Sequence, residues 1–179
     1  MDFISHGLWG GIALGRSNRK SFWLAFVFGI SPDLFAFGIA FLANVVAHGF
    51  EFTNRIGRPP DASQIPAYVH QLYNISHSLV IFAAAFGVVW LVRRKPVWEM
   101  GAWGLYVGLD IFTHTTAFFP TPFLWPFADV QFNGVAWSDP RIFFPNVGVL
   151  VVLYAVFLWK HKGWPKRVKI QDSKFKRAA

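Results

Sequence analysis

The sequence predicts an all-α fold, a polytopic transmembrane bundle of about four crossings with a short N-terminal helix half-inserted into the bilayer. Of the 179 residues, 54% are hydrophobic and only 15% are charged, which is too apolar a composition for an ordinary soluble domain. Several uninterrupted apolar stretches have the length of membrane spans, and short basic clusters flank them. Apolar runs of this length without alternation favour helices over strands.

The positive charge is concentrated beside the apolar stretches. The net charge is +8, and 14 of the 17 basic residues lie in three short segments, namely residues 16–20, 93–95 and 160–177. By the positive-inside rule these segments face the cytoplasm, so we expect a multi-pass protein of the inner membrane with a cytoplasmic C-terminus. The basic tail would also contact anionic lipid headgroups, and the bilayer rather than nucleic acid is the expected partner.

The first expected element covers residues 3–15, an apolar and glycine-rich segment. Gly7, Gly11 and Gly15 are spaced four apart, which places them on one helical face where another helix can approach closely. At about 1.5 Å per residue this segment is too short to cross a bilayer of about 30 Å. We therefore expect a half-inserted or interfacial helix.

The second expected element runs from Ser21 to Ala47 and contains Ser31-Pro32-Asp33 near its middle. Proline removes a backbone donor and clashes with the preceding turn, so the sequence predicts a kink or break there. Backbone groups freed by a break are tolerated at membrane depth where they line a buried polar cavity. Asp33, directly after the break, would supply polar groups to such a cavity.

The remaining chain predicts three further spans in a single domain of residues 1–179. A polar connection at residues 48–73 leads to a span at Asn74–Val92, and the next span, Val97–Phe119, carries Gly104 and Gly108 at close-packing spacing. A loop rich in proline and aromatic residues at 120–145 precedes a last span at Val147–Trp159. A basic cytoplasmic tail follows at about 160–179.

Ionisable residues of metal-ligand type lie inside or beside these apolar segments. A central Asp costs roughly 2.5–3.5 kcal/mol on insertion scales, so such residues are candidates for function. At about 1.5 Å per residue from the nearest basic segment, all of them fall roughly 14–28 Å into the membrane, in overlapping layers. The sequence predicts that they share one cation, and the five are His6, Asp33, His77, Asp110 and His114.

Spacing and composition narrow this predicted site. Asp110 and His114 are four apart, so both side chains can reach one ion from one helical face. Ser76 and Ser78 flank His77 and could fix the tautomer of its ring. Asp33 could alternatively cap the helix that follows Pro32. The chain has no cysteine, so the ligands are imidazole and carboxylate; we expect zinc first, with manganese, iron and nickel as alternatives.

At these residues the sequence resembles the membrane-bound metal-dependent hydrolase family, a group of small polytopic inner-membrane proteins. The matching segments are Ser5-His6, Ser31-Pro32-Asp33, residues 73–78 (YNISHS), residues 110–114 (DIFTH) and residues 119–126 (FPTPFLWP). The resemblance implies a multi-pass helical fold, a metal centre and hydrolase activity. Members of the family often carry a histidine four residues before the position of Asp110, where this chain has Tyr106. Either Tyr106 supports a ligand or the site has one ligand fewer.

The leading functional hypothesis is a metal-dependent hydrolase that acts in the membrane on a phosphoester or related bond of a lipid-like substrate. Asp33, Asp110 and His70 are the candidate catalytic residues, because a carboxylate or His70 could act as general base. Two alternatives stay open. One is a non-catalytic membrane protein with a structural metal site, and the other is a small transporter that binds its cargo at the broken helix beside Asp33.

Overall fold

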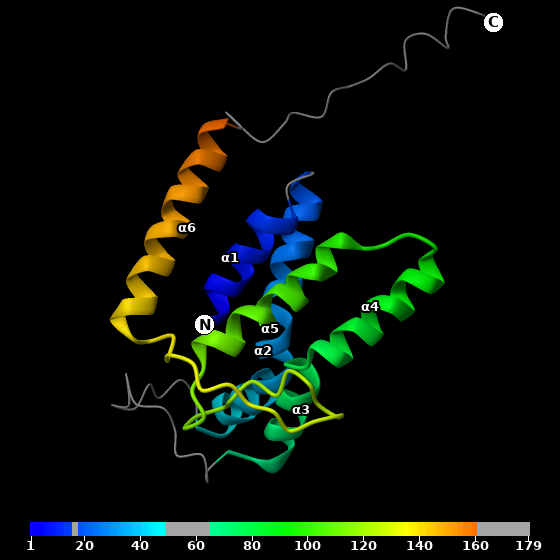
Figure 1. Ribbon diagram of the computed structural model, residues 1–179, viewed down its shortest axis with the longest axis vertical. Coiled ribbons are helices and arrows are strands. Elements are labelled where there is room, and N and C mark those ends of the chain that lie inside the picture. Colours follow the sequence, from blue (N-terminus) through cyan, green and yellow to red (C-terminus); the bar gives the residue numbers. More distant parts are fainter. Residues whose placement is uncertain (16–17, 49–64, 161–179) are drawn as a thin grey trace, which may run out of the picture.

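The computed structural model describes residues 1–15, 18–48 and 65–160, and within these ranges the regular structure is helical, as the sequence predicts. Figure 1 shows the arrangement, in which α1 and α2 lie at the centre, α5 crosses them, and α4 and α6 extend on opposite sides. The elements in chain order are α1 (Phe3–Leu14), α2 (Arg19–His48), α3 (Ala67–Ser76), α4 (Leu79–Arg93), the 3₁₀ turn η2 (Trp98–Met100), α5 (Gly101–Thr113) and α6 (Pro140–Lys160).

Two of these helices, α2 and α6, are long and apolar enough to cross a membrane. A third span is formed if α3 and α4, which meet at a bend of 59°, count as one broken crossing. The predicted span at Val97–Phe119 is shorter in the structure, because α5 has 13 residues and ends at Thr113. Thirteen residues extend about 20 Å, less than a bilayer core of about 30 Å. The helices fit a membrane protein of two or three crossings, and the fourth is not confirmed.

The contact between α1 and α2 depends on glycines, as the spacing in α1 predicts. Added Cβ atoms at Gly7 and Gly11 would lie 2.7 Å from side-chain atoms of α2. The backbones also approach closely at Gly29 of α2, where a Cβ would lie 2.6 Å from the carbonyl oxygen of His6. This contact fixes the position of His6 relative to α2. In α5, Gly104 likewise packs closely, against Phe82, whereas Gly108 faces open space.

Helix α2 is continuous through Pro32, so of the kink or break predicted at Ser31-Pro32-Asp33 the break is wrong. The helix begins after Asn18, whose side chain accepts hydrogen bonds from the backbone N–H groups of Lys20 and Ser21. Pro32 removes one backbone donor without ending the helix, and α2 runs on to His48. Asp33 therefore lies in the interior of a helix and does not cap a new one.

The real break lies between α3 and α4, at His77 and Ser78. Here the Ser78 hydroxyl accepts hydrogen bonds from the N–H groups of Val80 and Ile81 and so caps α4. The break places His77 directly after α3, with its side chain buried inside the bundle. The polar connection predicted for residues 48–73 is shorter than expected, because α3 begins at Ala67; residues 49–64 lie outside the described ranges.

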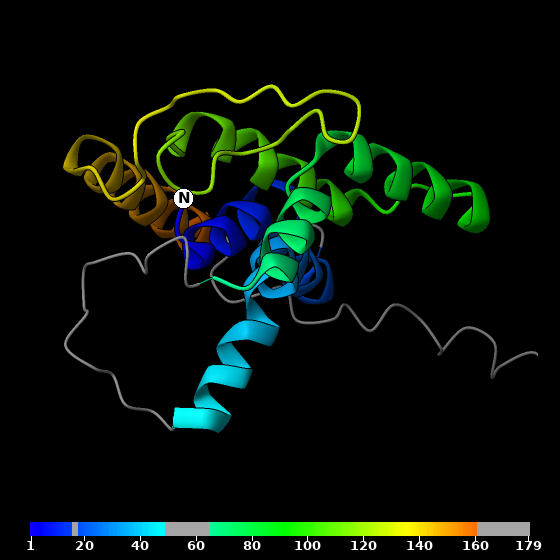
Figure 2. The same ribbon diagram turned by 90° about the horizontal axis from the view of Figure 1, so that it is seen from below.

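Helix α6 is attached to α1 through Asn146, which is buried. The Asn146 side chain donates to the Ser5 hydroxyl (2.9 Å) and accepts from the Trp9 indole (2.8 Å). Helix α6 begins at Pro140, seven residues earlier than the predicted span. Figure 2 shows the C-terminal part of α2 extending away from the other helices. Apolar side chains there are exposed, including Leu42 and Val46, which is compatible with contact with lipid. The predicted basic tail beyond Lys160 lies outside the described residues.

Candidate functional site

The structure brings the five predicted ligands together at the centre of the bundle. Four helices position them: α1 carries His6, α2 carries Asp33, α3 is followed directly by His77, and α5 carries Asp110 with His114 directly after its last residue. They form two groups that meet at Tyr106, and we call these five residues with Tyr106 the His–Asp cluster.

The first group is centred on the Asp110 carboxylate. His6 Nε2 lies 2.9 Å from Asp110 Oδ1, and His114 Nδ1 lies 3.5 Å from Asp110 Oδ2. The amine of Met1 and the hydroxyl of Thr113, at 3.2 Å, also donate to Oδ1. Because Asp110 and His114 are four residues apart, the end of α5 presents both to the same side, as the sequence predicts.

The second group is centred on the His77 ring. His77 Nδ1 lies 3.1 Å from the Tyr73 carbonyl oxygen and 2.9 Å from the Ser76 hydroxyl. These contacts hold the ring orientation, and Ser76 has the supporting role that the sequence predicts. On the other side of the ring, Nε2 lies 3.8 Å from Asp33 Oδ1, which is too far for a hydrogen bond.

Tyr106 connects the two groups. Its hydroxyl lies 2.6 Å from His77 Nε2, and its ring centroid lies 3.8 Å from that of His6. If His77 Nδ1 donates to the Tyr73 carbonyl, then Nε2 carries the lone pair and the Tyr106 hydroxyl donates to it. Of the sequence alternatives for Tyr106, this contact matches a residue that supports a histidine.

The cluster is buried at its centre and accessible at two edges. His77 and Asp110 are fully buried, and His6 and Tyr106 are 1% exposed. The Asp33 side chain is 22% exposed and the His114 side chain is 15% exposed. An ion or a small polar group would therefore reach the cluster past Asp33 or His114.

Two buried atoms of the cluster have no hydrogen-bond partner, His6 Nδ1 and Asp110 Oδ2. An ionised carboxylate only accepts, so His6 Nε2 donates to Asp110 and, in the neutral ring, Nδ1 keeps its lone pair. A histidine that donates one ring N–H to a carboxylate and offers the other nitrogen is the usual arrangement of a metal ligand. The donor types therefore fit a divalent cation.

The spacing of the side chains fits less well. Within the described residues, no group of three or more His, Asp or Glu side chains is arranged to hold a metal ion. The reason lies in the contacts above, because His77 Nε2 is bonded to Tyr106 and Asp110 Oδ1 is bonded to His6 and to the Met1 amine. Side-chain rotations that release these hydrogen bonds would be required before the five residues could share one ion.

Other predicted residues lie apart from the cluster or act differently. His70, the candidate general base, is exposed on α3 and stacks on Phe119, with ring centroids 4.8 Å apart. Ser78 caps α4 and donates to the Trp125 carbonyl instead of contacting His77. Sequence reasoning missed Tyr73 and Thr113, whose contributions come from a backbone carbonyl and from a hydroxyl one turn along α5. Both residues lie in the matching segments at 73–78 and 110–114, and the spacing of Thr113 from Asp110, three residues, is a further signal that could have indicated it.

Comparisons with family models, with curated proteins and with solved structures found no match for this chain.

Proposed function

We propose that the protein is a membrane hydrolase whose His–Asp cluster binds a divalent cation, zinc first, and that it acts on a phosphoester or related bond of a lipid-like substrate. The observation that carries the proposal is the unpartnered pair of buried atoms, His6 Nδ1 and Asp110 Oδ2, in a cluster of three histidines and two carboxylates. Burying a polar atom without a partner costs roughly 1–3 kcal/mol, and a cation bound to that atom would remove the cost. The resemblance to membrane-bound metal-dependent hydrolases points the same way.

Each residue has a defined part in this proposal. His6 would bind through Nδ1 while Asp110 holds its ring by accepting from Nε2. His77 would bind through Nε2 after the Tyr106 hydroxyl turns away. A divalent cation held by these residues would supply the Lewis acidity needed to ionise a water molecule and polarise the scissile oxygen. Asp33 is the more exposed of the two carboxylates, so it is the residue placed to orient an attacking water and accept its proton.

The same proposal includes a location. The basic segments at residues 16–20 and 93–95 and the tail from Lys160 would face the cytoplasm, and the tail would contact anionic headgroups. The protein would then be a multi-pass protein of the inner membrane. The apolar faces of α2 and α6 support this location, because such surfaces are stable only against lipid or another protein.

Hydrolysis tests the proposal directly. The purified protein, stripped with a chelator and then supplied with Zn²⁺, Mn²⁺, Fe²⁺ or Ni²⁺ separately, is assayed on phosphatidic acid, phosphatidylglycerol phosphate and p-nitrophenyl phosphate. We expect release of phosphate with at least one cation, and a loss of 100-fold or more, about 2.7 kcal/mol of barrier, in Asp110→Asn. Equal turnover by the parent protein and Asp110→Asn would contradict the assignment.

A second candidate is a non-catalytic membrane protein in which the cluster only joins the helices. The hydrogen bonds His6–Asp110 and His77–Tyr106 favour it, because they already link α1 with α5 and α3 with α5. It predicts that Asp110→Asn lowers the melting temperature and that no substrate is hydrolysed. The transporter alternative was based on a broken helix beside Asp33, and α2 is unbroken there.

A further inference from the structure

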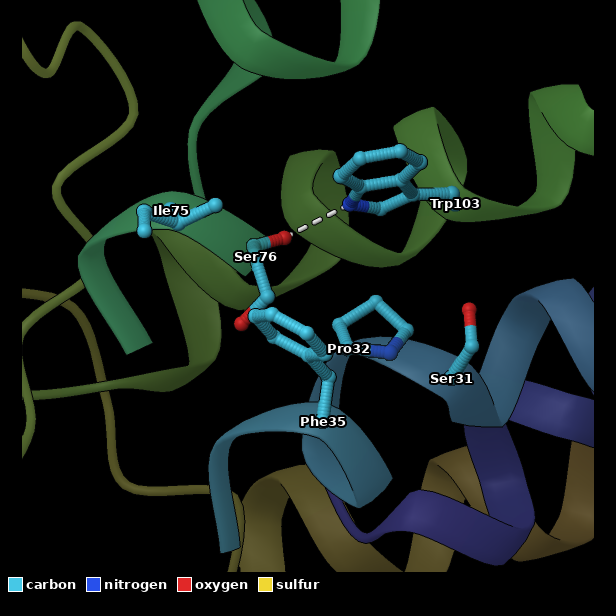
Figure 3. Close-up of a pocket in the computed structure, with 6 residues that line it drawn as sticks. All are labelled: Ser31, Pro32, Phe35, Ile75, Ser76 and Trp103. Carbon is cyan, nitrogen blue, oxygen red and sulfur yellow. Dashed lines mark hydrogen bonds between the residues drawn. The ribbon is translucent and has the colours of Figure 1, made fainter. Parts of the chain in front are cut away.

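A pocket of about 210 Å³ lies next to the His–Asp cluster, between α2, α3 and α5. Figure 3 shows that its walls come from all three helices: Ser31, Pro32 and Phe35 from α2, Ile75 and Ser76 from α3, and Trp103 from α5. The Trp103 indole donates to the Ser76 carbonyl at 2.6 Å, which fixes one wall against another. The Ser31 hydroxyl donates to the Phe28 carbonyl of its own helix, so it has no need of a ligand.

The chemistry of the pocket is almost wholly apolar, since its lining consists of a proline, two aromatic rings and an isoleucine beside two serines. A cavity of about 150 Å³ with such a lining holds a benzene ring, so this pocket has room for a segment of one hydrocarbon chain and not for a whole lipid. At its outer edge the Phe35 side chain is 49% exposed, so an occupant can enter from outside the bundle.

The position of the pocket identifies what can enter. Ser31 is 12 residues from the start of the candidate span Arg19–Val46, which is about 18 Å along the helix and near the middle of the span. At that depth of a bilayer the surroundings are acyl chains. An apolar pocket that opens there meets hydrocarbon and not water-soluble ligands.

The inner end of the pocket reaches the cluster. Ser76 lines the pocket and its hydroxyl lies 2.9 Å from His77 Nδ1, while Asp33 directly follows Pro32. The cluster extends from this side to His114, which lies where α5 meets the loop at residues 115–139. A molecule with its chain in the pocket would thus place its polar part along the cluster toward His114.

We propose that this pocket binds one acyl chain of a membrane phospholipid and so orients its headgroup ester toward the His–Asp cluster. The inference rests on the proposed function and adds to it the substrate class, a phospholipid held by its chain. The pocket distinguishes substrates by the chain and not by the headgroup, because its lining offers no charged group.

Photolabelling tests the proposal without turnover. The full-length protein in dodecyl maltoside micelles is irradiated with phosphatidylglycerol that carries a diazirine near the end of one acyl chain, and the labelled peptides are mapped by mass spectrometry. We expect label on Phe35, Ile75 or Trp103 that falls at least fivefold with excess unlabelled phosphatidylglycerol. Label on the exposed α4 residues Val88 and Leu91 should not compete, because those residues face bulk lipid or detergent.

Two variants fill the pocket, Ser31→Phe and Ile75→Trp, and each should lower the competed label at least fivefold. The matched control is Gly38→Phe, which adds the same ring to α2 where a Cβ meets nothing within 4 Å, and it should label as the parent does. Circular dichroism identifies any variant that does not fold. If neither filled variant folds, the competed labelling of the pocket residues in the parent protein decides the test. Label on the pocket residues that does not compete, or that both filled variants retain, would overturn the proposal.

The failures of the two proposals are distinguishable. If phosphate is released in a metal-dependent reaction but the pocket residues carry no competed label, the pocket proposal fails and the function stands. The opposite outcome is competed label in both the parent protein and Asp110→Asn, with no hydrolysis of any phospholipid by either. The proposed function then fails, and the pocket is a lipid site that does not orient a substrate.

Discussion

Tyr106 contacts both parts of the cluster and so controls whether they can act together. Its hydroxyl occupies the Nε2 atom of His77, the nitrogen that would face a cation, and its ring packs on His6. The side chain is fully enclosed, so its hydroxyl must keep a partner when it leaves His77. Tyr106 therefore holds the His77 ring in place, and it also competes with a cation for the lone pair of His77 Nε2.

Replacing Tyr106 tests this competition. In Tyr106→Phe the His77 Nε2 is released, and the affinity for Zn²⁺ should rise about fivefold, equivalent to the roughly 1 kcal/mol of one hydrogen bond. In Tyr106→His the affinity should rise about tenfold or more, because the added imidazole supplies a further nitrogen ligand at the cluster. Isothermal titration of the chelator-stripped protein measures both. A fall in affinity in Tyr106→Phe would show that the hydroxyl supports a ligand and does not compete.

The convergence of His6, His77 and Asp110 could be predicted from the sequence. Ionisable groups buried in apolar segments need polar partners, and these residues can partner one another. The orientation of their rings could not. It depends on backbone carbonyls such as that of Tyr73 and on the hydroxyl of Tyr106, and no spacing in the sequence encodes such contacts. His70 shows the same limit, because seven residues from His77 it lies on an exposed face instead of in the cluster.

At the scale of the elements, the sequence predicts a kink or break at Pro32 and does not predict the break at His77-Ser78. Proline suggests a break at Pro32, but α2 tolerates the lost donor and continues. No proline lies between His77 and Leu79, yet the chain bends by 59° there because the Ser78 side chain caps α4 and offers its N–H groups an alternative partner. A serine inside an apolar stretch indicates a helix start less clearly than proline indicates a helix end. From the sequence, Ser78 is expected to support the His77 ring and not to cap a helix.

The close contact of α1 with α2 makes a prediction about glycine. In Gly29→Ala the new Cβ would lie 2.6 Å from the His6 carbonyl oxygen, so α1 must shift. We expect a loss of about 1–3 kcal/mol in the free energy of unfolding, together with weaker Zn²⁺ binding because His6 moves. Thermal unfolding in detergent measures the loss of stability.

The control for this variant is on the same helix. Gly38→Ala adds the same methyl group where nothing lies within 4 Å, and it should be neutral or more stable by up to about 1 kcal/mol through helix propensity. Equal melting temperatures for the two variants would contradict the packing of α1 on α2.

For the whole molecule, the number of crossings is the part of the sequence prediction that the structure does not confirm. Hydropathy placed a span at Val97–Phe119, but α5 is only 13 residues long and the chain after it folds back, with Gly134 donating to the His114 carbonyl and Val135 to the Phe112 carbonyl. Apolar composition reflects burial in the bundle as well as burial in lipid, and a sequence cannot separate the two. Helix α5 carries Asp110, and its apolar residues Ala102 and Val107 are buried inside the bundle.

The sidedness of the proposed topology can be measured with single cysteines, because the chain has none of its own. In the proposed topology α5 and the loop after it together carry the chain across the membrane a fourth time. Lys95→Cys and Lys160→Cys should then react with a membrane-impermeant maleimide from the cytoplasmic side, and Gln131→Cys should react from the other side. Labelling of intact spheroplasts and of inverted vesicles gives the comparison. Reaction of Lys95→Cys and Gln131→Cys from the same side would show that α5 does not carry the chain across the membrane.

The central claim is that the buried His–Asp cluster binds a divalent cation, and elemental analysis of the purified protein tests it most directly. The account predicts about one Zn²⁺, Mn²⁺, Fe²⁺ or Ni²⁺ ion per chain in the parent protein, and a loss of at least tenfold in Asp110→Asn. Asp139→Asn is the matched control, because Asp139 is paired with Arg141 at the surface, where the hydrogen bond lowers its pKa to about 2. That variant should keep the parent's metal content. Well under one ion per chain in the parent, or equal metal in the parent and Asp110→Asn, would contradict the claim.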